Sequence, residues 1–168
     1  MKILVTGGLG FVGRALVQKL LSQGHEVHAV GRTPNPPKNK LVHGLNYHNY
    51  DLTNHPLVLP WLKGTEAVFH VAAKAGIGGG YEAYRQANLI ATENLLNASL
   101  EHGVAKFIYT STPSVVFSTR PICGGDESLP YSNEHFSPYA TSKALAERMV
   151  LAANNFSGMR TLALRPHL

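Results

Sequence analysis

The chain has 168 residues, of which 44% are hydrophobic and 15% are charged, a balance that suits one globular domain. Its single cysteine, Cys123, excludes an internal disulfide and fits a reducing compartment, so we expect a cytoplasmic location. No stretch reaches the roughly 20 consecutive apolar residues that a membrane-spanning helix needs. The formal net charge is +5, but the basic residues are scattered and not interleaved with aromatics, so no nucleic-acid partner is predicted.

The first thirty residues predict the opening of a βαβ unit. A short apolar run at 2–6 predicts a buried strand, an apolar stripe over 14–23 predicts a helix, and 25–30 predicts a second strand. Glycines fill the turn between the first strand and the helix, in the sequence GGLGFVG at 7–13. In this context glycines allow a sharp turn and a close approach of a pyrophosphate, and the helix N-terminus offers free N–H groups.

The glycines of this turn fit two spacings. They can be read as Gly8-x-Gly10-x-x-Gly13 or as Gly7-x-x-Gly10-x-x-Gly13, and both predict a dinucleotide site. The residues that we expect to bind the phosphates are Gly7, Gly10, Phe11, Val12 and Gly13.

The end of the second predicted strand bears on the choice of cofactor. An acidic residue at this position would hold the ribose hydroxyls of NAD, but Gly31 stands there and Arg32 follows it. An arginine can bind a 2′-phosphate through charge-assisted, bidentate hydrogen bonds. The sequence therefore favours NADP(H), with NAD(H) as the alternative if Arg32 is an ordinary solvent-exposed loop residue.

The remainder of the chain continues the alternation of strands and helices. Small residues follow the strand at 66–71, in the segment Ala72-Ala73-Lys74, and allow a ligand to approach the backbone. The expected fold is α/β, a Rossmann-type doubly wound parallel sheet in the order 3-2-1-4-5-6, with helices on both faces. Further strands are predicted at 45–50, 66–71, 106–110 and 160–164, and helices at 54–62 (weak, with two prolines), 81–102 and 138–155.

A Tyr-x-x-x-Lys pair, Tyr139 and Lys143, lies near the start of the last predicted helix, so both side chains share one helix face. A neighbouring ammonium lowers the pKa of a phenol, which can then exchange a proton with a substrate oxygen near neutral pH. The lysine can also hold the ribose hydroxyls of the cofactor, so Tyr139 and Lys143 are predicted as cofactor-binding residues as well. A hydroxyl from the segment 110–114, at the carboxyl end of a strand, can hold that oxygen. Asn88, in the helix at 81–102, is a candidate to bind a water that links Lys143 to solvent.

Taken together, the motifs resemble the extended short-chain dehydrogenase/reductases, and within them the 3β-hydroxysteroid dehydrogenase branch. The matching segments are TGGLGFVG, HVAAKAG, YTSTPSVVF, DESLPY, YATSKALAERMVLAAN and ALRPHL. The resemblance implies a catalytic tetrad of Tyr139, Lys143, Thr112 and Asn88, with Ser111 as the fallback for Thr112. It further implies that Asp51 and Leu52 lie near the adenine and that Ala72 and Ala73 line the cofactor.

The resulting hypothesis is an NAD(P)-dependent oxidoreductase that interconverts a secondary alcohol and a ketone on a small, apolar substrate of the 3β-hydroxysteroid or 2-alkyl-3-oxoalkanoate type. The alternatives are a nucleotide-sugar epimerase or dehydratase, and a cofactor-binding module without catalysis. Relatives are about twice as long, so we expect residues 1–168 to form the NAD(P)-binding domain and the substrate-binding part to be missing. The resemblance implies a homodimer through the helices at 81–102 and 138–155. The nine histidines show no metal-ligand spacing, so no metal is predicted.

Overall fold

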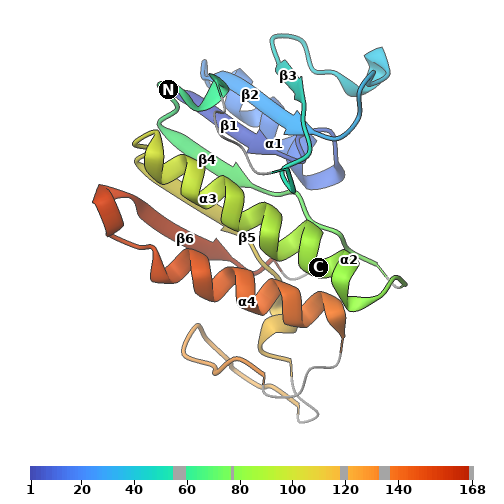
Figure 1. The fold of residues 1–168 in the computed structure, drawn as a ribbon, viewed down its shortest axis with the longest axis vertical. Helices are drawn as coiled ribbons and strands as arrows, with labels where there is room; N and C mark the ends of the chain where they lie inside the picture. Colours follow the sequence, from blue (N-terminus) through green and yellow to red (C-terminus); the bar gives the residue numbers. More distant parts are fainter. Residues whose placement is uncertain (55–59, 77, 118–120, 133–136, 167–168) are drawn as a thin grey trace.

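A computed structural model describes residues 1–54, 60–76, 78–117, 121–132 and 137–166 of the chain. Its centre is a six-stranded sheet in which every pair of neighbouring strands is parallel, in the order β3-β2-β1-β4-β5-β6 (Figure 1). This order confirms the prediction of a Rossmann-type sheet. The strands are β1 (Lys2–Thr6), β2 (Glu26–Gly31), β3 (Asn46–Asn49), β4 (Ala67–His70), β5 (Lys106–Thr110) and β6 (Arg160–Leu164).

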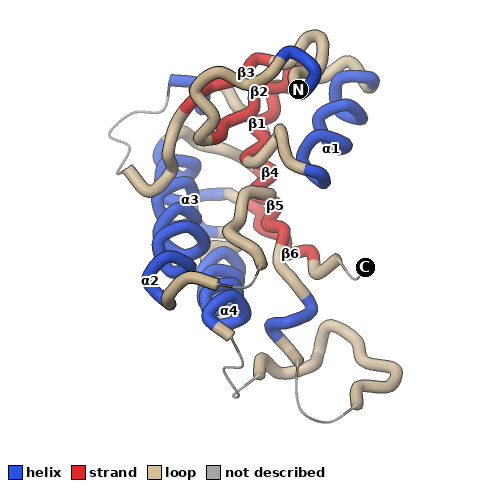
Figure 2. The backbone as a smooth tube through the Cα atoms, turned by 90° about the vertical axis from the view of Figure 1, so that its right-hand side faces the viewer, coloured by secondary structure: helices blue, strands red, loops and turns tan. Residues whose placement is uncertain are grey.

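Helices cover both faces of the sheet, as predicted. Helix α1 (Phe11–Ser22) lies on one face, and α3 (Ala91–Glu101) and α4 (Pro138–Ala152) lie side by side on the other (Figures 1 and 2). Because side chains alternate along a strand, β1 supplies both cores. Ile3 and Val5 pack in the α1 core, whereas Leu4 packs in the α3–α4 core.

The segment predicted as one helix over 81–102 is helical throughout, but it changes geometry in its middle. Helix α2 (Tyr81–Tyr84) leads into a π-helical stretch at Arg85–Ile90, and α3 follows directly. π-helical turns are uncommon in proteins, and those that occur often lie at functional sites. Here the turn carries Asn88, whose side chain reaches the loop after β4.

Several element bounds differ from the sequence predictions for local reasons. Helix α1 begins at Phe11, three residues earlier than predicted, because Gly10 serves as its N-cap. Helix α4 begins at Pro138 behind an N-cap hydrogen bond from Ala140 N–H to the Ser137 hydroxyl, at 3.1 Å. It ends at Ala152, and Asn155 adopts a left-handed conformation with φ of 66°, which a continuing helix does not allow.

Two further sequence predictions concern a weak helix at 54–62 and the absence of a membrane-spanning helix. Of the weak helix predicted at 54–62, only a short 3-10 helix at Pro60–Leu62 is seen, and residues 55–59 lie outside the described residues. None of the described helices combines the length and the apolar character that crossing a membrane requires.

Candidate functional site

The glycine turn between β1 and α1 adopts the second of the two spacings. Gly7 has a positive φ of 66°, and its carbonyl oxygen accepts a hydrogen bond from Gly10 N–H at 2.9 Å. A Cβ atom on Gly13 would lie 2.2 Å from the same carbonyl oxygen, so only glycine fits there. Gly8 serves packing instead, because a Cβ on it would meet the Ala29 side chain at 2.7 Å. The working pattern is therefore Gly7-x-x-Gly10-x-x-Gly13.

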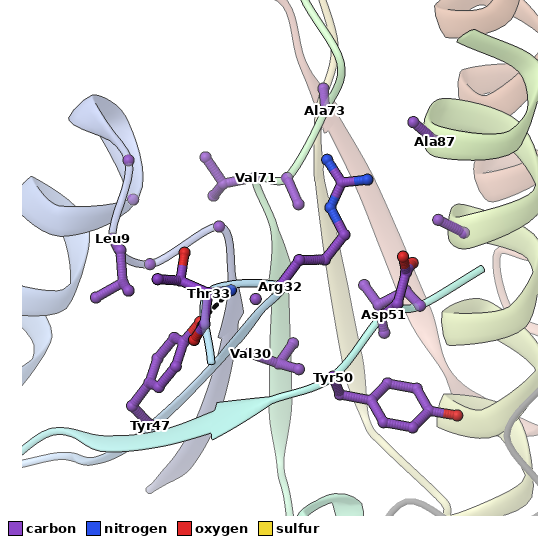
Figure 3. Close-up of a pocket in the computed structure, with 18 of the residues that line it drawn as sticks. Leu9, Val30, Arg32, Thr33, Tyr47, Tyr50, Asp51, Val71, Ala73 and Ala87 are labelled. Carbon is purple, nitrogen blue, oxygen red and sulfur yellow. Dashed lines mark hydrogen bonds between the residues drawn. The ribbon is translucent and has the colours of Figure 1, made fainter. Parts of the chain in front are cut away.

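A cavity of about 600 Å³ opens over this turn, at the carboxyl ends of β1, β2 and β4 (Figure 3). It lies where open α/β sheets bind their ligands, because the strand order reverses on either side of β1. The predicted cofactor residues that line it are Gly7, Gly10, Phe11, Val12, Gly13, Arg32, Asp51, Leu52, Ala72, Ala73 and Lys74. Tyr139 and Lys143, predicted as cofactor residues too, are not among the lining residues.

The cavity wall beside β2 is basic. Figure 3 shows the Arg32 side chain extending from the end of β2 across the cavity towards the segment that holds Val71 and Ala73. Lys40 also lines this wall, although the sequence analysis did not single it out. Asp51 follows β3, the strand beside β2, and its carboxylate accepts hydrogen bonds from the Thr53 N–H and hydroxyl, both at 2.9 Å (Figure 3).

Tyr47 of β3 forms hydrogen bonds with the loop that carries Arg32. Its hydroxyl accepts from Thr33 N–H at 3.2 Å and donates to the Thr33 carbonyl at 3.1 Å (Figure 3). A Cβ on Gly31 would lie 3.1 Å from this hydroxyl. Tyr47 thereby fixes the loop that carries Arg32, a role that the sequence analysis missed because the two segments are far apart in the chain.

Asn88 holds the loop after β4. Its Oδ1 accepts from Lys74 N–H at 2.7 Å, and its Nδ2 donates to the Lys74 carbonyl and to Ser142 Oγ, both at 3.0 Å. The side-chain amide is thus committed to the loop and to α4. Its observed role is to position Lys74, and a water between Asn88 and Lys143 stays a prediction.

A buried chain of hydrogen bonds connects the glycine turn to the Asn88 segment. Thr6 Oγ1 lies 2.6 Å from Nδ1 of His70, and Nε2 of His70 lies 2.8 Å from Thr92 Oγ1. The Thr92 hydroxyl donates to the Asn88 carbonyl at 2.6 Å, so its single proton is used and His70 Nε2 must be the donor to Thr92. Nδ1 is then the acceptor from Thr6, which assigns the Nε2–H tautomer.

Lys143 is held at the carboxyl end of β5. The residue is 2% exposed, and its Nζ donates to the Thr110 carbonyl at 2.6 Å and lies 4.1 Å from the Tyr109 ring centre. Burial lowers the pKa of Lys143 to about 7, while the negative charge of Glu147 acts in the opposite direction. The contact with Thr110 places this face of α4 beside the segment that carries Thr112.

The other predicted catalytic residues surround this point. Tyr139 lies one turn before Lys143 on α4, half-buried, with its ring edge-on to that of Tyr84 at 6.4 Å between centres. Thr112 follows β5 and interacts through Oγ1 with Ser114. Ser111 turns inward, and its hydroxyl donates to the Glu147 carboxylate.

Glu147 is a buried functional candidate that sequence reasoning missed. It is 1% exposed and accepts hydrogen bonds from Tyr131 at 2.9 Å and from Arg165 at 2.6 Å and 3.0 Å. The signal was present in the sequence, since Glu147 follows Lys143 by four residues as Lys143 follows Tyr139. Among the described residues, no group of three histidine, cysteine or carboxylate side chains is arranged to hold a metal ion.

The order of the strands, the glycine turn and the cavity above it define a Rossmann-type domain with the architecture of dinucleotide-binding proteins. The family model described as 3-beta hydroxysteroid dehydrogenase/isomerase matches residues 4–168, and the chain belongs to this family. The sequence expectation of the 3β-hydroxysteroid dehydrogenase branch is thereby confirmed.

Individual proteins show the same relationship. A 2-alkyl-3-oxoalkanoate reductase of Stenotrophomonas maltophilia is 46% identical over 170 residues, which cover 100% of this chain and 51% of that protein. A 3 beta-hydroxysteroid dehydrogenase/Delta 5→4-isomerase of Mycobacterium tuberculosis is 40% identical over 98% of this chain and 46% of its own length. The Thermus thermophilus UDP-glucose 4-epimerase complex with NAD superposes with a TM-score of 0.83 at 28% identity, covering 98% of this chain and 54% of that one. The chain thus spans about half the length of the curated relatives it matches.

Proposed function

We propose that this chain is the NAD(P)-binding domain of an oxidoreductase that interconverts a secondary alcohol and a ketone. The observation that carries the proposal is the joint presence of a glycine-lined cavity and of a Tyr139–Lys143 face at the carboxyl edge of one parallel sheet. A dinucleotide cofactor, when bound, supplies or accepts the hydride, and the protein orients it and handles the proton.

The residues take the following roles in this proposal. Free N–H groups at the start of α1, beyond Gly10, bind the pyrophosphate. Tyr139 gives a proton to the substrate oxygen during reduction and takes one from it during oxidation. Lys143 supplies positive charge on the same face of α4 as Tyr139, and the Thr112 hydroxyl holds the substrate oxygen.

NADP(H) is the preferred cofactor in this proposal. Arg32 and Lys40 place two positive charges on the cavity wall that follows β2, and Arg32 forms no ion pair with the described residues. A 2′-phosphate carries negative charge and acceptor oxygens that suit a guanidinium. A titration with NADPH and NADH, followed by nicotinamide fluorescence, tests this preference.

Two substitutions test whether Arg32 is responsible for the preference for NADPH. We expect Arg32→Ala to weaken NADPH binding by roughly tenfold to a hundredfold and to leave NADH binding nearly unchanged, as for the loss of a charged hydrogen bond. Lys38→Ala is the matched control, because Lys38 is exposed on the same loop and does not line the cavity. Equal affinity for NADPH and NADH in the unaltered chain would contradict the NADP(H) preference.

The supporting relatives favour an apolar substrate of the 2-alkyl-3-oxoalkanoate or 3β-hydroxysteroid type, as their names state. A nucleotide-sugar epimerase is the second candidate, favoured by the close superposition on UDP-glucose 4-epimerase. Both reactions use the same hydride step, so the substrate discriminates between them. NADPH oxidation with a 3-oxoalkanoate tests the first candidate. An epimerase returns the hydride to the sugar and regenerates its cofactor, so the second candidate is tested by chromatographic separation of UDP-glucose and UDP-galactose. Turnover only of the UDP-sugar would reject the first candidate.

The catalytic assignment has its own test. We expect Tyr139→Phe to abolish turnover while the dissociation constant for NADPH stays within about twofold, since the phenol acts on the substrate proton. Retained turnover would refute the role of Tyr139. We further expect the 168-residue chain to turn substrate over more slowly than a chain of its relatives' length, and equal specific activities would contradict this.

A further inference from the structure

The face of α4 that carries Tyr139 and Lys143 continues to Glu147. The three residues recur at intervals of four, so they follow one another along the helix about 6 Å apart. The first two have roles in the proposed function. The third has none there, although it is a carboxylate that is 1% exposed, and buried charges are costly unless they are paired.

The Glu147 carboxylate joins three segments that are distant in the chain. Its Oε1 accepts from Tyr131 at 2.9 Å, from Arg165 Nε at 3.0 Å and from Arg165 Nη2 at 2.6 Å. Its Oε2 accepts from the hydroxyl of Ser111. The loop before α4, the end of β5 and the end of β6 therefore converge on one carboxylate.

These donors keep the carboxylate ionised. Burial alone would raise the pKa of Glu147, but the hydrogen bonds from Arg165, Ser111 and Tyr131 outweigh burial and lower the pKa below its ordinary value. The guanidinium partner is itself only partly exposed, with 21% of its side-chain surface accessible. The carboxylate is thus held ionised one helical turn from Lys143, and the Arg165 guanidinium on its Oε1 side carries the opposing positive charge.

Other titratable groups also face Lys143. Tyr109 of β5 lies under the ammonium, and burial raises its pKa, so it stays protonated. His70 of β4 is fully buried and its pKa is lowered, so it stays neutral, and Tyr139 lies on α4 itself. Among these described neighbours of Lys143, Glu147 is the carboxylate, and it counteracts the desolvation of the ammonium.

We propose that Glu147 is a positioning residue, whose buried carboxylate keeps Lys143 charged and held at the carboxyl end of β5. Through Ser111 the same carboxylate also fixes the backbone that leads into Thr112. The proposal deepens, and rests on, the oxidoreductase function proposed above, because Lys143 is there the group that supplies positive charge on the Tyr139 face of α4. A structural ion pair without effect on Lys143 is the competing explanation.

Direct titration of Lys143 separates the two explanations and needs no cofactor. The ¹³Cε signal of Lys143, assigned by its loss in Lys143→Met, reports the protonation of the ammonium as the pH is varied. We expect Glu147→Gln to move the titration midpoint to lower pH by on the order of one unit, because a nearby opposite charge is lost. Glu101→Gln, which removes the charge of an exposed glutamate on α3, is the matched control and should leave the midpoint unchanged.

A second variant protects the test against unfolding. Glu147→Gln alone leaves Arg165 unpaired, whereas the double variant Glu147→Gln/Arg165→Gln leaves no buried charge without a partner. We expect the double variant to unfold within a few degrees of the unaltered chain. Its Lys143 midpoint is compared with that of Arg165→Gln, because these two variants differ in the Glu147 charge alone, and we expect the lower midpoint in the double variant. A folded double variant with the same midpoint as Arg165→Gln would overturn the proposal, because the pair would then be structural only.

The dissociation constant for NADPH, measured over the same pH range, links this inference to function. We expect its pH dependence to shift in the same direction as the Lys143 midpoint in the double variant. A chain that binds neither NADPH nor NADH would refute the proposed function, while the Lys143 titration would still decide the role of Glu147.

Discussion

The side-chain amide of Asn88 forms two hydrogen bonds with the backbone of Lys74. Lys74 N–H donates to Oδ1 at 2.7 Å, and Nδ2 donates to the Lys74 carbonyl at 3.0 Å. Asn88 sits in the π-helical stretch between α2 and α3, and Lys74 lines the cavity, so this contact ties the middle helix to the wall of the cofactor site.

Removing this contact should loosen the cavity wall. We expect Asn88→Ala to lower the free energy of unfolding by about 1–3 kcal/mol, because partly buried backbone groups of Lys74 lose their partners. The dissociation constant for NADPH should also rise several-fold. Urea unfolding and fluorescence titration measure both effects. Asn97→Ala, on an exposed position of α3, is the control, and an Asn88→Ala protein that matches it would contradict the assigned role.

The contact between Gly13 and the Gly7 carbonyl predicts a steric effect. A Cβ at position 13 would lie 2.2 Å from that oxygen, well inside van der Waals contact. We expect Gly13→Ala to displace the turn, to cost about 1–3 kcal/mol of stability, and to weaken NADPH binding at least tenfold. Gln18→Ala, on the exposed side of α1, controls for a substitution in the same helix. Unchanged NADPH affinity in Gly13→Ala would show that the turn is not the phosphate site.

The buried His70 predicts a dependence of stability on pH. Burial, with a smaller effect of the Lys143 charge, lowers the pKa of His70 to about 3 from an ordinary 6.5. Between these values the unfolded chain binds a proton that the folded chain does not, so the contribution of His70 is complete above pH 6.5 and is lost as the pH falls towards 3.

We expect His70→Asn to flatten this dependence by up to about 1.4 kcal/mol per pH unit between pH 6 and 4. Urea unfolding at several pH values measures the slope. His43→Asn, which removes an exposed imidazole, is the control. Equal slopes for His70→Asn and the unaltered chain would mean that His70 accepts a proton in the folded state.

The end of β2 predicts how the cofactor preference can be changed. We expect Gly31→Asp to move the ratio of NADH to NADPH affinity towards NADH by roughly tenfold or more, since a carboxylate repels a 2′-phosphate and accepts from ribose hydroxyls. The new Cβ would lie 3.1 Å from the Tyr47 hydroxyl, so Tyr47 must shift by a few tenths of an ångström. Asn39→Asp adds the same charge on the neighbouring loop, away from the cavity lining, and a shift of equal size there would exclude a local effect.

The sequence by itself determined the sheet and the glycine turn. Apolar runs of strand length alternate with helical stripes, and right-handed crossovers between parallel strands leave few possible orders, so β1 to β6 and their arrangement could be predicted. The sequence also identified the residues of the phosphate turn, because the glycines lie between a strand and a helix only a few residues away. The strands and the glycine turn could be predicted because each depends on residues that lie close together in the chain.

Only the tertiary structure decided which of the two glycine spacings operates and which side chains meet. The choice lies between Gly7, which has a positive φ of 66°, and Gly8, which packs against the Ala29 side chain, and both are properties of the folded turn. Glu147 contacts Tyr131 and Arg165, 16 and 18 residues away in the chain, and Thr6 contacts His70 across 64 residues. Such contacts arise because the sheet brings the carboxyl ends of its strands to one edge, where burial makes each polar group require a partner.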